Sequence, residues 1–300
     1  MIDIRYHIAT LVAVFLALGL GILIGSGLVN SNVISDQQAK IIDQLKVEFE
    51  DLRGQKVELT AQNDYLSRMI KYHDEFNREM MPALIKNRLA GEQVAVVLTG
   101  GEQIPPGLFN TLSLAGVKVA STSIFLPNAS MEDPGVRTKL SQYYNLPDTS
   151  SPEEMQSLVA KTVARIVSAD GADKEIALLK QLNLVKMNGQ FGVPVKAVIV
   201  VGGANDLQYY FPETIDQPLI EYFNEVKKTV YGVENAQVTK SYMDLYQKLH
   251  INTIDDIDLM VGQLALILSM DGEPGNFGVK STAQKFMPAL PVEYLGGTTP

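Results

Sequence analysis

The chain has 300 residues, of which 46% are hydrophobic and 20% charged, and this composition excludes a chain that is disordered over most of its length. A net charge of −9 argues against a nucleic-acid-binding protein, which would carry a basic surface for phosphates. The absence of cysteine excludes disulfides, thiolate metal sites and a cysteine nucleophile. Residues 1–30 are neutral and residues 31–90 carry nine Lys or Arg against ten Asp or Glu, so −8 of the charge belongs to residues 91–300.

A transmembrane anchor is predicted within residues 1–30. Residues 8–29 form a run of 22 positions without a charge, and at about 1.5 Å per residue such a helix crosses a hydrocarbon core of about 30 Å. A cleaved signal peptide is the alternative, but its apolar core would be about 7–15 residues long. We therefore expect a single-pass protein of the cell membrane. Arg5 and the terminal amine slightly favour an amino terminus on the inside, so we expect the C-terminal domain to be extracytoplasmic.

Small residues recur at every fourth position of this segment. They are Ala9, Ala13, Ala17, Gly21 and Gly25. Small residues on one helix face let a second helix approach closely, although they are also common in membrane helices generally. We expect the last four of them to belong to a homodimer interface.

A charged, periodic segment follows and predicts a long helix from about residue 34 to Pro82, because proline disfavours helix at the preceding residue. Leucines at 45, 52, 59 and 66 are spaced by seven, as at the d positions of a heptad repeat, and residues 42, 49, 56, 63 and 70 take the a positions. This pattern predicts a parallel coiled-coil stalk over 31–90. Its predicted interface consists of Ile42, Leu45, Phe49, Leu52, Leu59, Asn63, Leu66 and Ile70. A helix that packs on its own globular domain is the alternative.

From residue 91 the pattern changes to short valine-rich runs between helical stretches, which is typical of an α/β domain with a mostly parallel sheet. Strands are predicted at 94–98, 117–121, 195–201 and 229–233. Helices are predicted at 106–115, 152–168, 174–182, 218–228, 242–249, 255–270 and 282–287. We expect a Rossmann-like domain over residues 91–300.

Two of these strands end in paired glycines, Gly100–Gly101 and Gly202–Gly203. Open parallel sheets hold ligands at the carboxyl ends of their strands. Neither pair belongs to a dinucleotide-binding or P-loop fingerprint. The four glycines are a candidate ligand loop, and a tight strand-to-helix turn is the alternative.

No catalytic residue, cofactor-binding residue or metal ligand is predicted, and we expect a protein that is not an enzyme. The three histidines are scattered, and no nucleophile–base pair is visible. An enzyme with a pocket at Gly100 and Gly202 is an alternative. The acidic stretch Asp255, Asp256 and Asp258 predicts the amino terminus of a helix, with a calcium site as the alternative.

The opening Asp3-Ile-Arg5-Tyr6-His7-Ile8, together with the apolar run at 11–21 and Ile24-Gly25-Ser26, resembles the MctB family, which is described as copper transport outer membrane proteins. The resemblance continues through 200–203, 262–266 and 275–283. It implies an anchor, a coiled coil and an α/β domain, and a role in copper transport. The family also includes proteins of the SteB type, which implies a role in cell separation and in the control of cell-wall hydrolases with a membrane partner.

The residues fit the copper role poorly. One helix per chain encloses no pore without substantial oligomerisation, and an outer-membrane pore needs a closed β-barrel. The eleven methionines form no M-x-M or M-x-x-M array, and His73 with Met80 and Met81 is the local candidate for soft ligands, with packing as the alternative. No cofactor is predicted, and copper is implied by the resemblance alone.

The function we expect is that of a binding or scaffold component of the cell envelope. The partners we expect are a second copy of the chain and a second envelope or membrane protein, with no nucleic acid. Copper transport or copper handling across the envelope is the alternative function.

Overall fold

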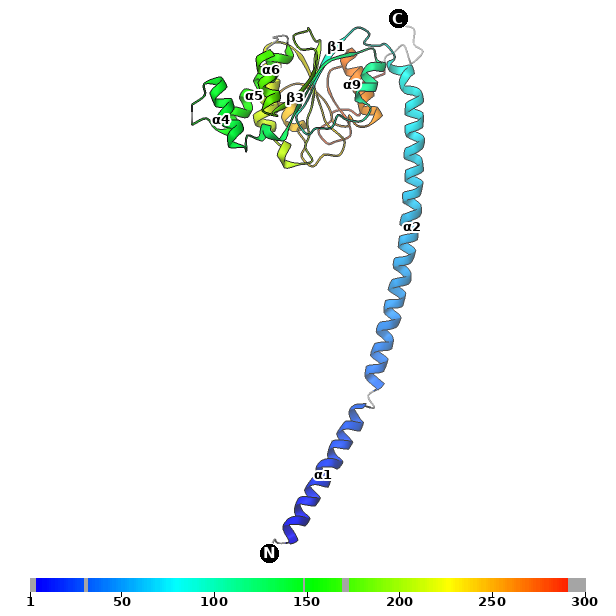
Figure 1. The fold of residues 1–300 in the computed structure, drawn as a ribbon. Coiled ribbons are helices and arrows are strands. Elements are labelled where there is room, and N and C mark those ends of the chain that lie inside the picture. Colours follow the sequence, from blue (N-terminus) through cyan, green and yellow to red (C-terminus); the bar gives the residue numbers. More distant parts are fainter. Residues whose placement is uncertain (1–3, 30–31, 148, 169–172, 291–300) are drawn as a thin grey trace. The chain divides into compact units, whose positions relative to one another are not determined.

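The computed structural model describes residues 4–29, 32–147, 149–168 and 173–290 (Figure 1). The chain divides into two compact units, Met1–Tyr72 and His73–Pro300. This division into two units does not test the three predicted domains, 1–30, 31–90 and 91–300, which stay predictions.

The first unit is helical. Helix α1 spans Ile4–Val29, and among the described residues it is the one helix long and apolar enough to cross a membrane, as judged by length and composition. Helix α2 spans Asn32–Ile85. It begins in the first unit and ends in the second.

The predicted helix stop at Pro82 is wrong, because α2 continues to Ile85. A proline removes the hydrogen bond from its own nitrogen to the carbonyl four residues earlier, but its carbonyl still accepts. The Lys86 nitrogen donates to the Pro82 oxygen at 3.1 Å, and Ile85 is fully buried. Burial of this last turn therefore offsets the lost bond.

The second unit is built on a seven-stranded sheet with the order β3-β2-β1-β4-β5-β6-β7. The strands are β1 (Gln93–Leu98), β2 (Lys118–Phe125), β3 (Val185–Gly189), β4 (Ala197–Val201), β5 (Thr229–Val233), β6 (Asn252–Ile254) and β7 (Asn276–Phe277). Neighbouring strands are parallel except β2 and β3. The prediction of an α/β unit with a mostly parallel sheet is confirmed.

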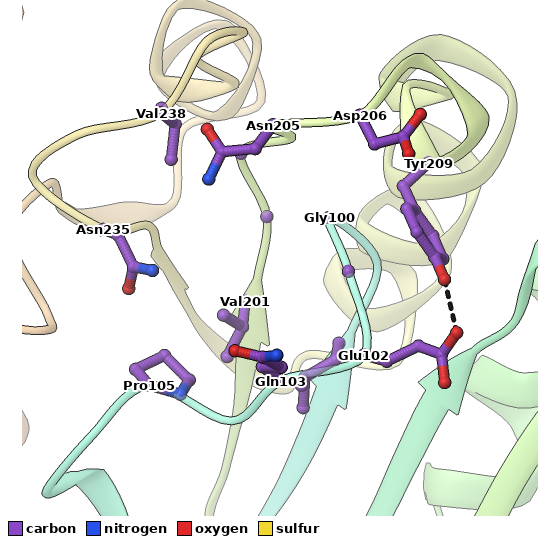
Figure 2. Close-up of a pocket in the computed structure, with 14 residues that line it drawn as sticks. Gly100, Glu102, Gln103, Pro105, Val201, Asn205, Asp206, Tyr209, Asn235 and Val238 are labelled. Carbon is purple, nitrogen blue, oxygen red and sulfur yellow. Dashed lines mark hydrogen bonds between the residues drawn. The ribbon is translucent and has the colours of Figure 1, made fainter.

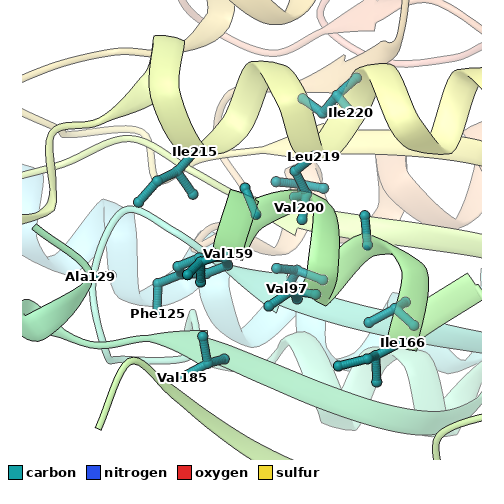
Figure 3. Packing of buried hydrophobic residues seen from close by; sticks show 14 of the residues in the cluster. Val97, Phe125, Ala129, Val159, Ile166, Val185, Val200, Ile215, Leu219 and Ile220 are labelled. Carbon is teal, nitrogen blue, oxygen red and sulfur yellow. The ribbon is translucent and has the colours of Figure 1, made fainter. Parts of the chain in front are cut away.

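Helices cover both faces of the sheet (Figure 1). One face carries the end of α2 with α3 (Leu108–Leu114) and α9 (Met260–Asp271). The other face carries α4 (Pro134–Tyr144), α5 (Pro152–Ser168), α6 (Asp173–Gln181), α7 (Gln217–Glu225) and α8 (Met243–Lys248), with the short turns η1 (Pro127–Ser130), η2 (Leu207–Tyr209) and η3 (Pro212–Asp216). Side chains of a strand alternate between the two cores. Val97 and Val200 thus pack under α5 and α7 (Figure 3), and Val96 and Ile199 pack on the opposite side.

Local hydrogen bonds at the amino terminus of α5 explain why the helix begins at the predicted residue. The Ser151 hydroxyl accepts a hydrogen bond from the Glu154 nitrogen at 3.2 Å, and the Glu154 carboxylate accepts one from the Ser151 nitrogen at 3.0 Å. This is a capping box, and Pro152 occupies the first turn, where it costs no hydrogen bond. Local chemistry alone therefore fixes where this helix begins.

The helix predicted at 255–270 starts too early, and the helix predicted at 282–287 is wrong. The segment that starts at Asp255 is not helical until Met260, because the Asp255 carboxylate accepts hydrogen bonds from the nitrogens of Val279, at 2.8 Å, and Lys280 instead of capping a helix. Residues 282–287 form no helix, because the nitrogens of Gln284 and Lys285 donate to the Asn276 oxygen beside β7. Contacts distant in sequence decide both segments.

Candidate functional site

The two paired-glycine loops meet at the carboxyl ends of β1 and β4. The chain runs from β1 to β2 and β3 on one side, and from β4 to β5, β6 and β7 on the other. The boundary between β1 and β4 is therefore the point at which the strand order reverses, where open α/β sheets form a crevice. The structure thus brings together the four glycines of the candidate ligand loop.

Close packing explains part of this glycine pattern. The Gly100 nitrogen donates to the Val201 oxygen at 3.3 Å, and a Cβ atom at Gly100 would overlap the carbonyl oxygen of Gly203. Gly203 has a φ of +74°, in the left-handed region that favours glycine. The alternative that the glycines serve the turns accounts for these two positions.

A cavity of about 560 Å³ lies between the two loops (Figure 2). Besides the four glycines it is lined by Leu98, Glu102, Gln103, Pro105, Val201, Asn205, Asp206, Tyr209, Asn235 and Val238. These residues end or follow β1, β4 and β5, so three strand ends contribute. We call this cavity the switch-point cleft.

Hydrogen bonds orient the polar side chains of the switch-point cleft. The Tyr209 hydroxyl donates to the Glu102 carboxylate (Figure 2), and burial together with that carboxylate raises the pKa of Tyr209 to about 12. The Asn205 side-chain oxygen accepts a hydrogen bond from the Thr239 nitrogen at 2.9 Å. The NH₂ group of the Asn205 amide is therefore left to donate. The cleft therefore presents a phenol, two carboxylates and three amides.

The charge of the switch-point cleft limits its ligands. Of the described residues that line it, Glu102 and Asp206 are acidic, and none is Lys, Arg or His. A phosphate or carboxylate ligand would meet like charge without a compensating cation. The lining suits a neutral or cationic polar ligand, and it shows no arrangement of nucleophile and base.

A buried carboxyl group, that of Asp216, is hydrogen-bonded to Thr99, the residue before the first glycine pair. Asp216 accepts hydrogen bonds from the Thr99 hydroxyl at 2.7 Å and the Tyr246 hydroxyl at 2.5 Å. Burial raises the pKa of Asp216 to about 7 despite these two donors, and it also raises the pKa of Tyr246. No sequence motif predicts this group, since Thr99, Asp216 and Tyr246 are far apart along the chain.

A second buried carboxylate holds the end of β5. Glu234 is fully buried and accepts from the Lys280 ammonium at 2.5 Å, the Ser241 hydroxyl at 2.6 Å and the Tyr242 nitrogen at 2.9 Å. Lys280 also donates to the Asn235 carbonyl at 2.9 Å. This ion pair therefore positions the residue that closes one side of the switch-point cleft.

The acidic stretch after β6 serves the fold in part. The Asp258 carboxylate accepts from the Ala236 nitrogen at 2.7 Å. Burial, followed by the charges of Asp255 and Asp258, raises the pKa of Asp256 to about 7. Among the described residues no group of three or more His, Asp or Glu is placed to hold a metal ion.

The predicted dimer residues lie on the exposed surfaces of α1 and α2 within the single chain. The side chains of Leu45, Leu52, Leu59 and Leu66 are 48–64% exposed. Ala13, Ala17, Gly21 and Gly25 are exposed on α1. Their role in a dimer stays a prediction.

Comparison with known proteins relates nearly all of the chain to one family. The family model described as "Copper transport outer membrane protein, MctB" matches residues 1–288. A protein of Mycobacterium tuberculosis named "Copper transporter MctB" is 32% identical over 99 residues, which cover 33% of this chain and 29% of the relative, and its counterpart in Mycobacterium bovis matches equally. Protein ORF1940 of Acidianus two-tailed virus is 25% identical over 186 residues, or 60% of this chain and 9% of the viral protein. The chain thus spans less than a third of the length of these relatives.

Proposed function

Since the chain belongs to the MctB family, we propose that it is a single-pass, membrane-anchored protein of the cell envelope that dimerises and acts as a binding or scaffold component. In this proposal α1 is the anchor and the α/β unit lies on the extracytoplasmic side. The main observation in support is the apolar stripe of α2, formed by its a and d residues, which is exposed to solvent in a single chain. The resemblance to the SteB type adds control of cell-wall hydrolases and cell separation as the process it would serve.

The exposed stripe of α2 supports a parallel coiled coil. Large apolar side chains occupy all four d positions and three of the five a positions and lie in solvent, whereas Lys56 and Asn63 take the other two a positions. Globular proteins avoid large contiguous apolar patches. A second copy of α2 would cover them. Glu48 at a g position would then face Arg53 at an e position of the other helix, which is an attractive pair in a parallel arrangement.

The α/β unit supports the binding role through the switch-point cleft. Its strand order contains 3-2-1-4-5-6, the order of doubly wound dinucleotide-binding folds, although β3 here is antiparallel. We propose a Rossmann-like unit that has kept the crevice without the phosphate-binding loop. A dimer would present two such clefts to an envelope partner.

The oligomeric state of the full chain in detergent micelles tests the proposal. We expect the wild type to have twice the protomer mass, and the double variant Leu52→Lys/Leu59→Lys to dissociate, because each copy would bury two uncompensated ammonium groups at d positions. Ala61→Lys, at the outward f position of the same helix, is the matched control and should stay dimeric. A monomeric wild type at high concentration would contradict the proposal.

A strain that lacks the protein tests the function. We expect that a chain without residues 37–72, which keeps the whole unit His73–Pro300, fails to restore growth and cell separation, and that substitutions in the paired glycines have smaller effects. Crosslinking in the native membrane should capture a regulator of wall hydrolases or a second membrane protein. Full rescue by the shortened chain would contradict a scaffold role.

Copper handling is the second candidate function. Its support is the name of the family and of the mycobacterial relatives. It predicts that the deletion strain is more sensitive to copper than the wild type and that the full chain restores resistance. Equal sensitivity of the two strains would exclude it.

A further inference from the structure

A second cavity, of about 520 Å³, lies within the unit His73–Pro300. It is formed by the last turns of α2, the start of α9 and the segment that ends at Leu290. Its lining consists of His73, Phe76, Asn77, Met80, Met81, Leu84, Met260, Val261, Leu264, Phe286, Met287 and Leu290. We call this cavity the thioether groove, because four of its twelve lining residues are methionines.

The methionines come from three separate parts of the chain. Met80 and Met81 lie on α2, Met260 is the first residue of α9, and Met287 follows β7. The chain contains eleven methionines, so more than a third of them line this one cavity. Met260 and Met287 belong to no short methionine array in the sequence, because only the fold brings them to α2.

The chemistry of the groove selects a soft, low-charge metal ion. Thioether sulfur is a soft ligand that suits Cu(I), whereas hard divalent ions prefer oxygen ligands. In a chain without cysteine, methionine supplies the softest donors. His73 adds an imidazole, and of the described residues that line the groove none is Asp, Glu, Lys or Arg.

The groove is open enough for an ion to enter. Met80 is 40% exposed, and the lining residues Phe76 and Phe286 are 62% and 55% exposed. Met81, by contrast, is buried at 7% exposure and packs in the core with Ile85 and Leu89. One side of the groove is thus anchored in the fold while the other faces solvent.

We propose that the thioether groove binds Cu(I) through the sulfur atoms of Met80, Met81, Met260 and Met287, with His73 as a further ligand at its mouth. The inference rests on copper handling, the second candidate function above, and gives it a site. The ion is bound and released by ligand exchange, with no change of oxidation state. Hard ions such as Mg²⁺ find no oxygen ligands there other than the Asn77 side-chain amide among the lining side chains that the structure describes.

Competition for Cu(I) tests the proposal with the full chain in detergent micelles. Under anaerobic, reducing conditions the protein competes with the chromophoric chelator bicinchoninate, and the wild type should withdraw one Cu(I) per chain. The variant with all four residues changed to Leu keeps apolar side chains of similar size. Its affinity should fall at least about tenfold, as expected when metal ligands are lost.

Met187→Leu is the matched control, since Met187 is buried in the core on the other face of the sheet. It should bind Cu(I) like the wild type. Circular dichroism and thermal unfolding check that each variant is folded. X-ray absorption at the copper edge should show sulfur neighbours in the wild type and their loss in the fourfold variant.

Two outcomes would overturn the proposal: a wild type that withdraws no Cu(I), or a folded fourfold variant that binds as tightly as the wild type. The second outcome would leave the thioethers as packing residues. Copper sensitivity of the deletion strain is a separate readout. If that sensitivity is present while the groove binds nothing, copper handling stands and the site fails; if the groove binds while both strains are equally sensitive, the site stands and the function fails.

Discussion

Replacing Asp216 by Asn tests the burial of an ionisable group beside the switch-point cleft. Both hydrogen bonds to Asp216, from Thr99 and Tyr246, end on the same oxygen, Oδ1. An asparagine can accept both through its own Oδ1, and it stays neutral at every pH. The variant therefore imitates the protonated form of Asp216 and removes its ionisation.

The magnitude follows from the pKa of Asp216. Burial raises this pKa from 3.8 to about 7, and a shift of about 3 units corresponds to about 4 kcal/mol. The folded chain holds a proton that the unfolded chain releases, so this contribution to stability is complete below pH 3.8 and is lost as pH rises toward 7. About 3 kcal/mol of it falls between pH 5 and pH 8.

Urea unfolding of the full chain, followed by near-ultraviolet circular dichroism of the tyrosines, measures the effect. The difference in unfolding free energy between Asp216→Asn and the wild type should shift in favour of the variant by about 3 kcal/mol from pH 5 to pH 8. Comparison with the wild type cancels the contribution of Asp256, whose pKa is also raised to about 7. A difference that does not change with pH would refute the assignment of a buried, protonated carboxyl group.

Two further predictions concern the walls of the switch-point cleft. Lys280→Met should lower the unfolding free energy by about 3–5 kcal/mol in the same urea assay, because it leaves the Glu234 carboxylate buried without its cation. Lys285→Met, at an exposed ion pair, should lower it by less than about 1 kcal/mol. Equal effects of the two substitutions would contradict the role of burial. Gly100→Ala should cost about 1–3 kcal/mol, because its Cβ meets the backbone of Gly203, and a neutral result would contradict the close packing of the two loops.

The parts of the fold that could be predicted are those with local signals. The helix of residues 152–168 has a capping box and a proline at its start, and the buried strands are runs of valine. The antiparallel edge strand β3 and helix α4 were not predicted. In β3 the buried residues Val185 and Met187 alternate with polar ones over only five positions, which is too short a pattern to separate from a loop.

The candidate site was predictable at the level of its loops and no further. Parallel strand ends share one edge of the sheet, so the glycine pairs at 100 and 202 could be expected to meet. The buried groups around them depend on tertiary contacts, such as Thr99 with Asp216 and Glu234 with Lys280. Met80 and Met260 both line the thioether groove, and this proximity could not be predicted because it too depends on tertiary contacts.

A disulfide crosslink at Leu59 tests the central claim, a parallel dimer through α2, most directly. The chain contains no cysteine, so a single Leu59→Cys substitution gives one thiol per copy, and oxidation in native membranes can join only equivalent positions. In a parallel coiled coil two d positions face each other, so we expect nearly complete conversion to a covalent species of twice the protomer mass, and little for Ala61→Cys at the f position. Equal, low crosslinking at both positions would contradict the dimer.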